Sequence, residues 1–293
     1  MAKKVIVFGG SGFLGSQVCD ILSKKGYRVI IFDNKKSNWL KAKQEVVVAD
    51  ILDHKKVDQV ISKSDFVYNF AALSDLNESI NEPIATANIN IIGTLNILEA
   101  CVKYNIKKFI YASSIYVLSH LGSFYRCSKQ SAELFIEEYH RLHGLNFNIL
   151  RYGSLYGPRS DRSNGVYRLI KQAIKNRKII FSDDQETIRE YIHILDAAKA
   201  SVEILESDKV PNRALMLTGN EITKSKDLAN KIANILDINF EIKFDPKKNI
   251  YQSSHYIKEP NTYVPLKSEK YTIDNYVKLE QGISELINII KSE

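Results

Sequence analysis

The chain has 293 residues, of which 44% are hydrophobic and 26% charged, and its formal net charge at pH 7 is +7. This composition is typical of a globular protein with a large core, and no apolar run approaches the roughly 18 residues of a membrane span. The lysines are scattered instead of clustering with aromatic residues, which favours a solvated basic surface over nucleic-acid binding. The three cysteines form no CxxC pair, which argues against a disulfide framework or a zinc site. We therefore expect a cytoplasmic protein without metal, membrane or nucleic-acid partner.

Short apolar runs alternate with helical patterns through the first half of the chain. Strands are predicted at residues 5–8, 28–32, 45–49, 65–72, 108–113 and 147–151, and helices at residues 17–25, 57–62, 84–104 and 125–142. Strands that are apolar almost throughout and are separated by helices are typical of a parallel sheet covered on both faces. The predicted fold class is therefore α/β, with a doubly wound parallel sheet of the Rossmann type.

The alternation changes after residue 155, where the turn-rich stretch YGPRSDRSNG begins. The predicted elements that follow are a helix at 166–176, a strand at 178–181, the segment REYIHILD at 189–196 leading into a helix, a strand at 213–217 that returns to the sheet, and amphipathic helices at 226–236 and 277–290. We expect a sheet domain at residues 1–155, with a return at about 189–219, and a smaller, mainly C-terminal α/β lobe at residues 156–293.

The first strand runs directly into the glycine-rich sequence GGSGFLG. Gly9 permits a tight turn, Gly12 lets the backbone approach a pyrophosphate, and Gly15 lets the next helix pack on the strand. Phosphates then lie at the helix N-terminus. Asp33 ends the second strand, where it can accept hydrogen bonds from both ribose hydroxyls and would repel a 2′-phosphate, so NAD is predicted over NADP. A glycine turn beside an exposed acid is the alternative. The predicted NAD contacts here are Gly9, Gly12, Phe13, Leu14, Gly15, Asp33 and Asn34.

Asp50 and Ile51 follow the third strand, at the edge that lies beside the adenine in this architecture. Asp50 could accept a hydrogen bond from the adenine amino group, and Ile51 could offer backbone contacts. The alternative for Asp50 is an exposed acid at a strand end.

The spacing YxxxK places a tyrosine and a lysine on one face of a helix. It occurs four times, at Tyr104/Lys108, Tyr125/Lys129, Tyr167/Lys171 and Tyr263/Lys267. Only Tyr125 and Lys129 begin the helix that follows the fifth strand, whose carboxyl end faces the cofactor. Ser113 and Ser114 lie at that strand end, so this pair is the candidate for catalysis.

In this order, the motifs GGSGFLG, IFDN, ADI, NFAA, NINIIGTLNILEA, YASS, YRCSK, LRYGSLYGPR and REYIHILDAA resemble extended short-chain dehydrogenases/reductases of the NAD-dependent epimerase/dehydratase family, including UDP-glucose 4-epimerase-like enzymes. They span residues 5 to about 200, and the last ninety residues match loosely. The resemblance implies that Tyr125 is the general base and acid and that Lys129 stabilises its phenolate and holds the nicotinamide ribose. It implies that Ser114 binds the substrate oxygen, although a helix-capping serine is the alternative.

The resemblance implies further contacts to NAD. Phe70, Ala71 and Ala72 would line the nicotinamide-side ribose, Asn90 would fix the loop after the fourth strand, and Tyr152 would approach the nicotinamide. Core packing is the alternative for Phe70 and Tyr152. The NAD-binding set is therefore predicted to include Asp50, Ile51, Phe70, Ala71, Ala72, Asn90, Tyr125, Lys129 and Tyr152.

The sequence departs from the family at the sugar pocket. Dehydratases of the family have an Asp–Glu pair directly after the catalytic Ser or Thr, whereas Ile115 and Tyr116 stand there in this chain, so 4,6-dehydration is not expected. The loop between Ser114 and Tyr125 is shorter than usual, which implies a more open pocket or one that another element completes.

Two further positions concern the substrate. Ser154 replaces an asparagine that commonly touches the substrate phosphate, and Arg189 matches an arginine that often contacts the nucleotide diphosphate. His193 is interpreted as a structural histidine. The predicted substrate-binding residues are Ser114, Ser154 and Arg189.

The function implied is that of an NAD-dependent nucleotide-sugar epimerase of polysaccharide biosynthesis. It would act at C4 through a 4-keto intermediate formed by transient hydride transfer to bound NAD. A nucleotide-sugar 4-ketoreductase or dehydrogenase is one alternative, and a non-catalytic NAD-binding sensor is another. The resemblance also implies a homodimer with a four-helix interface, and the substrate would be a nucleotide-diphosphate sugar.

Overall fold

The computed structural model describes residues 2–119, 121–181, 184–237, 240–245 and 269–292. Its central sheet has the strand order β13-β10-β6-β5-β4-β1-β2-β3, and every pair of neighbours is parallel. The strands are β1 (Lys4–Phe8), β2 (Arg28–Asp33), β3 (Gln44–Val48), β4 (Phe66–Asn69), β5 (Lys108–Ser114), β6 (Phe147–Tyr152), β10 (Arg213–Leu217) and β13 (Glu269–Lys270). The order 3-2-1-4-5-6 confirms the predicted doubly wound sheet. β10 pairs with β6, as expected for residues 213–217.

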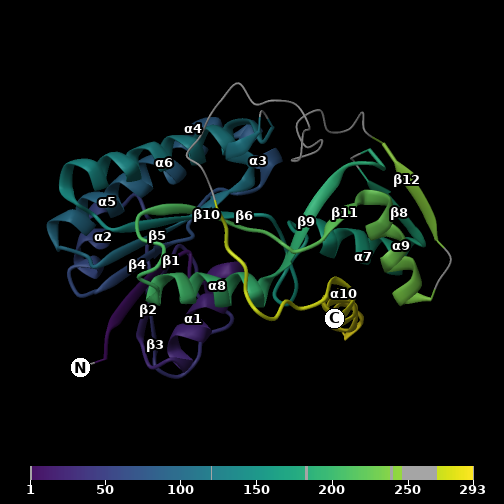
Figure 1. Cartoon of the computed structure of the whole chain (residues 1–293), viewed down its shortest axis with the longest axis horizontal. Coiled ribbons are helices and arrows are strands. Elements are labelled where there is room, and N and C mark those ends of the chain that lie inside the picture. Colours follow the sequence, from purple (N-terminus) through teal and green to yellow (C-terminus); the bar gives the residue numbers. More distant parts are fainter. Residues whose placement is uncertain (1, 120, 182–183, 238–239, 246–268, 293) are drawn as a thin grey trace.

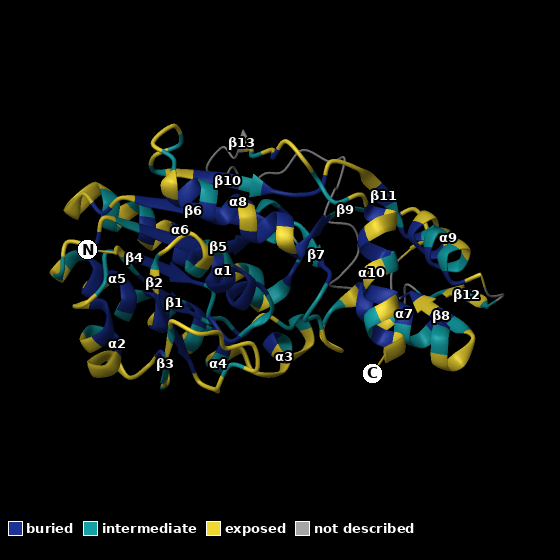
Figure 2. Ribbon diagram, turned by 90° about the horizontal axis from the view of Figure 1, so that it is seen from below, coloured by how far each residue is buried: buried dark blue, intermediate teal, exposed yellow. Residues whose placement is uncertain are grey.

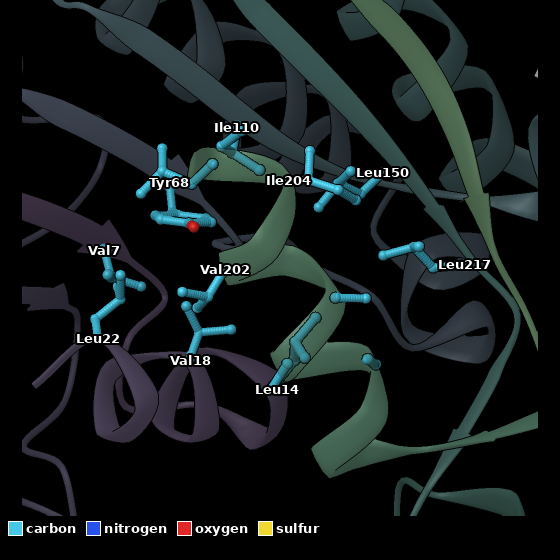
Figure 3. Packing of buried hydrophobic residues seen from close by; sticks show 14 of the residues in the cluster. Val7, Leu14, Val18, Leu22, Tyr68, Ile110, Leu150, Val202, Ile204 and Leu217 are labelled. Atoms are coloured by element: carbon cyan, nitrogen blue, oxygen red, sulfur yellow. The ribbon is translucent and has the colours of Figure 1, made fainter. Parts of the chain in front are cut away.

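Helices cover both faces of this sheet (Figure 1). One face carries α1 (Phe13–Lys24) and α8 (Ile194–Glu206), and the other carries α2 (His54–Ile61), α5 (Gly93–Lys103) and α6 (Ser123–His143). A hydrophobic core lies on each face of the sheet. Successive side chains of a strand point to opposite faces, so Val5 and Val7 of β1 pack in the core beneath α1 and α8, and Ile6 and Phe8 pack in the core beneath α2, α5 and α6. Figure 3 shows the core beneath α1 and α8, where Val18 of α1 lies beside Val202 of α8.

The predicted single helix at residues 84–104 is wrong in detail. It consists of α4 (Pro83–Ala87), a π-helical turn η1 (Asn88–Ile92) and α5, and a short helix α3 (Leu76–Asn81) precedes it. The extra residue of a π-turn often marks a functional position. Here it coincides with Asn90, whose side chain is tied to the backbone of Leu73.

The same stretch, Pro83–Lys103, is long and apolar enough to cross a membrane, yet 44% of its apolar 18-residue segment is buried inside the fold. It packs against α6 and α2, as a core helix does.

The second lobe lies at one end of the sheet (Figures 1 and 2). Its described residues form a sheet in the order β11-β9-β7, a parallel pair of β8 and β12, and three helices around a separate core. Its elements are β7 (Ser154–Tyr156), α7 (Gly165–Asn176), β8 (Lys178–Phe181), β9 (Ile188–His193), β11 (Ile222–Lys224), α9 (Ser225–Leu236), β12 (Glu241–Phe244) and α10 (Leu279–Ser292). The division into residues 1–155 and 156–293, with a return at about 189–219, stays a proposal. In the structure β9 belongs to the small sheet, whereas β10 and β13 belong to the central sheet.

Candidate functional site

The glycine-rich turn after β1 is too tight for side chains. A Cβ on Gly9, whose φ is +74°, would lie 2.6 Å from the Ala71 nitrogen, and one on Gly15 would lie 2.2 Å from the Gly9 oxygen. Gly12 precedes α1 and no side chain caps this helix end. The amino end of α1 therefore meets the carboxyl ends of β1 and β4 with backbone N–H groups directed outward, an arrangement that fits the phosphates of a dinucleotide. Phe13 and Leu14 form the first turn of α1.

Asp33 is buried beside this turn. One carboxylate oxygen accepts a hydrogen bond from the Ser11 amide (3.0 Å) and the other from the Lys35 amide (3.3 Å). Each oxygen keeps a further acceptor site, since a carboxylate accepts about four hydrogen bonds. The side chain is thus held at the end of β2 in a position suited to ribose hydroxyls, while Asn34 is exposed.

The two residues after β3 differ in their surroundings. Asp50 is exposed and accepts a hydrogen bond from the Leu52 amide at 2.9 Å. Ile51 is buried; a Cβ on Gly93 would lie only 2.8 Å from it, and its carbonyl already accepts a hydrogen bond from Asn96. Its side chain and carbonyl thus serve packing, and the predicted adenine contacts of both residues stay predictions.

Asn90 braces the loop that follows β4. Its amide group accepts a hydrogen bond from the Leu73 nitrogen (2.8 Å) and donates to the Leu73 oxygen (3.0 Å) and to Ser128 (2.9 Å). The loop residues Phe70, Ala71 and Ala72 are half-buried. The Phe70 ring stacks on Tyr68, with ring centroids 5.4 Å apart.

Ser114, Tyr125 and Lys129 meet at the carboxyl end of β5. Ser114 is close enough to the Tyr125 hydroxyl to lower the pKa of Tyr125 as a hydrogen-bonding partner. The Lys129 ammonium donates to the Ala112 carbonyl at 2.7 Å and lies 5.7 Å from the centroid of the Tyr125 ring. Ser114 also accepts from the Tyr116 amide at 3.3 Å, so the capping alternative describes a second contact of the same hydroxyl.

The charge states of this site depend on burial. Burial raises the pKa of Tyr125 above its usual range, and the Ser114 hydrogen bond opposes this only in part. Burial also lowers the pKa of Lys129 to about 7, against the opposing effect of the Glu133 charge. For the Tyr125 pKa, burial and the neighbouring Tyr116 thus outweigh the stabilisation of the phenolate that the family resemblance assigns to Lys129. The Lys129 ammonium lies near the Tyr125 ring and is bonded to a carbonyl.

A buried ion pair that the sequence analysis missed lies one helical turn beyond Lys129. Glu133 binds Arg151 of β6 through two hydrogen bonds of 3.0 and 2.6 Å and accepts a third from Ser113. The Arg151 side chain is fully buried and that of Glu133 is 5% exposed. The pair joins α6, which carries Tyr125 and Lys129, to the two strands beneath it. An arginine near the end of a mainly apolar strand was the available signal.

The short loop after Ser114 folds as a 3₁₀ turn η2 (Ile115–Leu118), and Gly122, with φ +97°, precedes α6. A Cβ on Gly122 would lie 2.7 Å from the Tyr116 ring, and this ring meets Tyr125 edge to face with centroids 6.4 Å apart. Tyr116 therefore lies directly against Tyr125, where the sequence analysis had noted only a missing acid.

Tyr152 is directed into the core. Its hydroxyl shares a hydrogen bond of 2.7 Å with Ser201 of α8, and 5% of the residue is exposed. This geometry favours the core-packing alternative over an approach of the ring to the nicotinamide.

Ser154 and Arg189 lie on neighbouring strands of the second lobe. Ser154 of β7 is opposite Tyr191 of β9, two residues from Arg189. Directly paired residues and those two positions apart share a face of a sheet, so both half-buried side chains project to the same side.

His193 packs between the sheet and α10 and is almost fully buried, 5.3 Å from the Tyr156 ring. Burial lowers its pKa to about 4. Neither ring nitrogen makes a hydrogen bond within the described part of the chain, although Glu285 lies 3.4 Å away. These contacts support a structural role.

The other described YxxxK pairs lie away from this cluster and make different contacts. Lys171 donates to the Tyr167 hydroxyl at 2.8 Å on α7, in the second lobe, and Tyr104 binds Asp58. Tyr263 and Lys267 lie outside the described residues. Among the described residues, no group of three or more His, Cys, Asp or Glu side chains could hold a metal ion.

The strand order, the glycine turn with its acid, and the Ser–Tyr–Lys cluster define a dinucleotide-dependent enzyme of the Rossmann class. Residues 5–217 match the model of the NAD dependent epimerase/dehydratase family. The chain belongs to this family, and its cofactor is NAD.

Known proteins resemble the chain over nearly its whole length. It is 32% identical to a putative UDP-glucose 4-epimerase of Methanocaldococcus jannaschii, covering 98% of both chains. It is 27% identical to a UDP-N-acetyl-alpha-D-glucosaminuronate decarboxylase of Bacillus cytotoxicus, covering 98% of this chain and 97% of the other. The crystal structure of a UDP-glucose 4-epimerase of Thermotoga maritima with UDP-glucose is 25% identical, covers 99% of both chains and has a TM-score of 0.80.

Proposed function

We propose that the protein is an NAD-dependent nucleotide-sugar epimerase that inverts C4 through a 4-keto intermediate. The observation that carries the proposal is the meeting of Ser114, Tyr125 and Lys129 at the carboxyl edge of the sheet that also holds the glycine turn, in a chain similar throughout to a putative UDP-glucose 4-epimerase. Bound NAD supplies a hydride acceptor that can return the hydride to either face of the ketone.

Ser114, Tyr125 and Lys129 have different roles in substrate binding, cofactor binding and proton transfer. Ser114 holds the reacting oxygen of the sugar, and Tyr125 takes up and returns its hydroxyl proton. Lys129 binds the nicotinamide ribose and, when protonated, favours the Tyr125 phenolate. Because burial alone raises the Tyr125 pKa, proton transfer depends on the charges that surround the loaded site.

Binding of NAD and substrate uses the two lobes. The glycine turn and Asp33 hold the pyrophosphate and the adenosine ribose, and the loop at 70–72 borders the other ribose. Ser154 and Arg189, which share a face of the small sheet, bind the diphosphate of the nucleotide sugar.

A nucleotide-sugar 4-ketoreductase or dehydrogenase is the second candidate. We keep this candidate because the chain is also similar, over nearly its full length, to a decarboxylase, which catalyses a different reaction from an epimerase. An NAD-binding sensor without activity is a third candidate. It would leave the proximity of Ser114 and Tyr125 without a function.

The test is conversion of a panel of UDP-, GDP-, CDP- and dTDP-sugars by the purified protein without added cofactor. An epimerase forms the C4 epimer of one of them with no net change in absorbance at 340 nm. Product that appears only with added NAD or NADH, in stoichiometric amounts, would favour the oxidoreductase instead.

We also propose a cytoplasmic homodimer. The helices α4, η1 and α6, which pack against one another, carry exposed apolar side chains: Ile84, Ile92, Leu134, Phe135 and Leu142. Such a patch is typical of a protein interface. Free Cys19, Cys101 and Cys127 are compatible with a reducing compartment. Sedimentation of wild type as a dimer and of Phe135→Glu as a monomer would support the interface, whereas a monomeric wild type would exclude it.

A further inference from the structure

Arg159 reaches from the second lobe back to the cofactor side of the sheet. It lies in the turn between β7 and α7, and its guanidinium donates to the Asp20 carboxylate of α1 at 2.7 Å. Both side chains are largely buried, with 13% and 8% exposed. A second bond joins the same segments, from the Gln17 amide to the Pro158 carbonyl at 3.3 Å. The turn that leads into the second lobe is therefore fastened to the helix that begins at the glycine turn.

The segment after Asp33 joins the same cluster. The Arg159 guanidinium lies 4.9 Å from the centroid of the Trp39 ring, within the range of a cation–π contact. Lys41 also binds Asp20, at 2.7 Å, and Gln44 donates to it at 3.2 Å. Burial works to raise the pKa of Asp20, but the hydrogen bonds from Lys41 and Arg159 hold it below its ordinary value. Asp20 is therefore charged at neutral pH and holds cations from two separate segments.

This segment is anchored to the phosphate-binding turn at its other end. The Ser11 amide donates to Asp33, and the Ser11 hydroxyl donates to the Lys35 carbonyl at 3.0 Å. Residues 34–43 are thus held by the glycine turn where they begin and by Asp20 and Arg159 where they end. They follow directly on the carboxylate that is placed to bind the adenosine ribose.

The backbone of Arg159 is held in an unfavourable conformation. Its φ is +71°, a left-handed value that a residue with a Cβ rarely adopts. Its Nη1 atom is buried and makes no hydrogen bond within the described residues. Such strain persists where surrounding contacts enforce it and is concentrated at functional positions. Here the ion pair with Asp20 and the contact with Trp39 are those contacts.

We propose that Arg159 is a positioning residue that, through Asp20 and Trp39, clamps residues 34–43 at the adenosine side of the cofactor site and thereby retains NAD. The clamp also joins the cofactor site to the turn that enters the substrate-binding lobe. It rests on the binding of NAD and is independent of which reaction the enzyme catalyses.

The experiment measures the rate at which NAD leaves the protein. Trp39 is the only tryptophan of the sequence, so its emission reports on this cluster alone. Wild type, Arg159→Met and Asp20→Asn are loaded with NADH, and its dissociation is followed by the loss of energy transfer from Trp39 after dilution into excess NAD. We expect dissociation to become about tenfold faster in both variants, as for loss of a charge-assisted hydrogen bond. Their Trp39 emission without cofactor should also shift.

Arg162→Met is the matched control, because Arg162 is an exposed arginine three residues further along the same turn. It should dissociate NADH at the wild-type rate. Circular dichroism and melting establish that each variant is folded, and Arg159→Lys, which keeps the charge without the fork of the guanidinium, replaces Arg159→Met if that variant does not fold. Dissociation within twofold of wild type in folded Arg159 and Asp20 variants would overturn the proposal. It would leave the epimerase proposal untouched, since no sugar is present.

Discussion

Replacing Glu133 by glutamine leaves the guanidinium of Arg151 buried without its counter-charge. The change keeps the size and shape of the side chain, so it tests charge and not packing. In the wild type, two short hydrogen bonds and a full ion pair link side chains that are 0% and 5% exposed. Removing one partner of a pair buried to this degree costs roughly 3–5 kcal/mol, because the remaining charge stays desolvated.

We expect this loss in the free energy of unfolding measured with urea. A matched control lies on the same helix, where Glu138 pairs with Arg141 three residues later at the surface. Glu138→Gln should leave the free energy of unfolding almost unchanged, because water replaces the lost interaction. A second measurement is the pKa of Lys129, which should fall below about 7 in Glu133→Gln, since the Glu133 charge opposes the effect of burial.

A loss of less than about 1 kcal/mol in Glu133→Gln would refute this reasoning, because it would mean that Arg151 is hydrated or finds another partner. The double variant Glu133→Met/Arg151→Met removes both charges, so it distinguishes the cost of an unpaired buried charge from the loss of the ion pair itself. It should be more stable than Glu133→Gln, since it contains no unpaired buried charge.

Three further predictions concern Lys129, Gly15 and His193. In NAD-free protein, Lys129 loses its proton near pH 7 when folded but only near pH 10 when unfolded. The free energy of unfolding of wild type, measured with urea relative to Lys129→Met, should therefore rise by roughly 2 kcal/mol between pH 6.5 and 9. A difference between the two proteins that does not change with pH would contradict the lowered pKa. Gly15→Ala should abolish NAD retention on gel filtration, because its Cβ would lie 2.2 Å from the Gly9 oxygen, whereas Gly165→Ala, with open space around it, should retain NAD. Burial lowers the His193 pKa to about 4, so between about pH 6.5 and 4 only the unfolded chain binds a proton at His193. The melting temperature of wild type should therefore fall more steeply with decreasing pH than that of His193→Gln. Equal slopes for the two proteins would contradict the lowered pKa.

The sheet was predictable because its signals are local. The apolar strands, the glycine turn and the helices between them follow from period and composition, and the strand order is the one typical of a doubly wound sheet with such a turn. The start of α1 at Phe13 was placed four residues late, because Gly12 precedes the helix without a polar side chain that would mark its beginning.

The features that were missed depend on tertiary contacts. The strands β7, β11 and β12 are only three or four residues long, too short to show a period. The π-turn coincides with Asn90, whose side chain is hydrogen-bonded to Leu73, seventeen residues away.

Within the candidate site, Ser114, Tyr125 and Lys129 lie together as helix spacing and strand ends predicted, while their roles stay predictions. It could not place Glu133 beside Arg151, or Arg159 beside Asp20, because each pair joins residues from distant elements. The direction of the Tyr152 side chain was likewise open, because strand position alone left both core and cofactor possible.

The most direct test of the account is a single-turnover measurement on NAD-loaded protein with its nucleotide-sugar substrate, comparing wild type with Tyr125→Phe. The account predicts that wild type forms the C4 epimer without free cofactor, with any absorbance at 340 nm returning to its starting value. Tyr125→Phe should keep NAD but form product at least about 100-fold more slowly, since the phenol that moves the proton is gone. Wild-type rates in Tyr125→Phe would contradict the assigned role of this hydroxyl and with it the proposed chemistry.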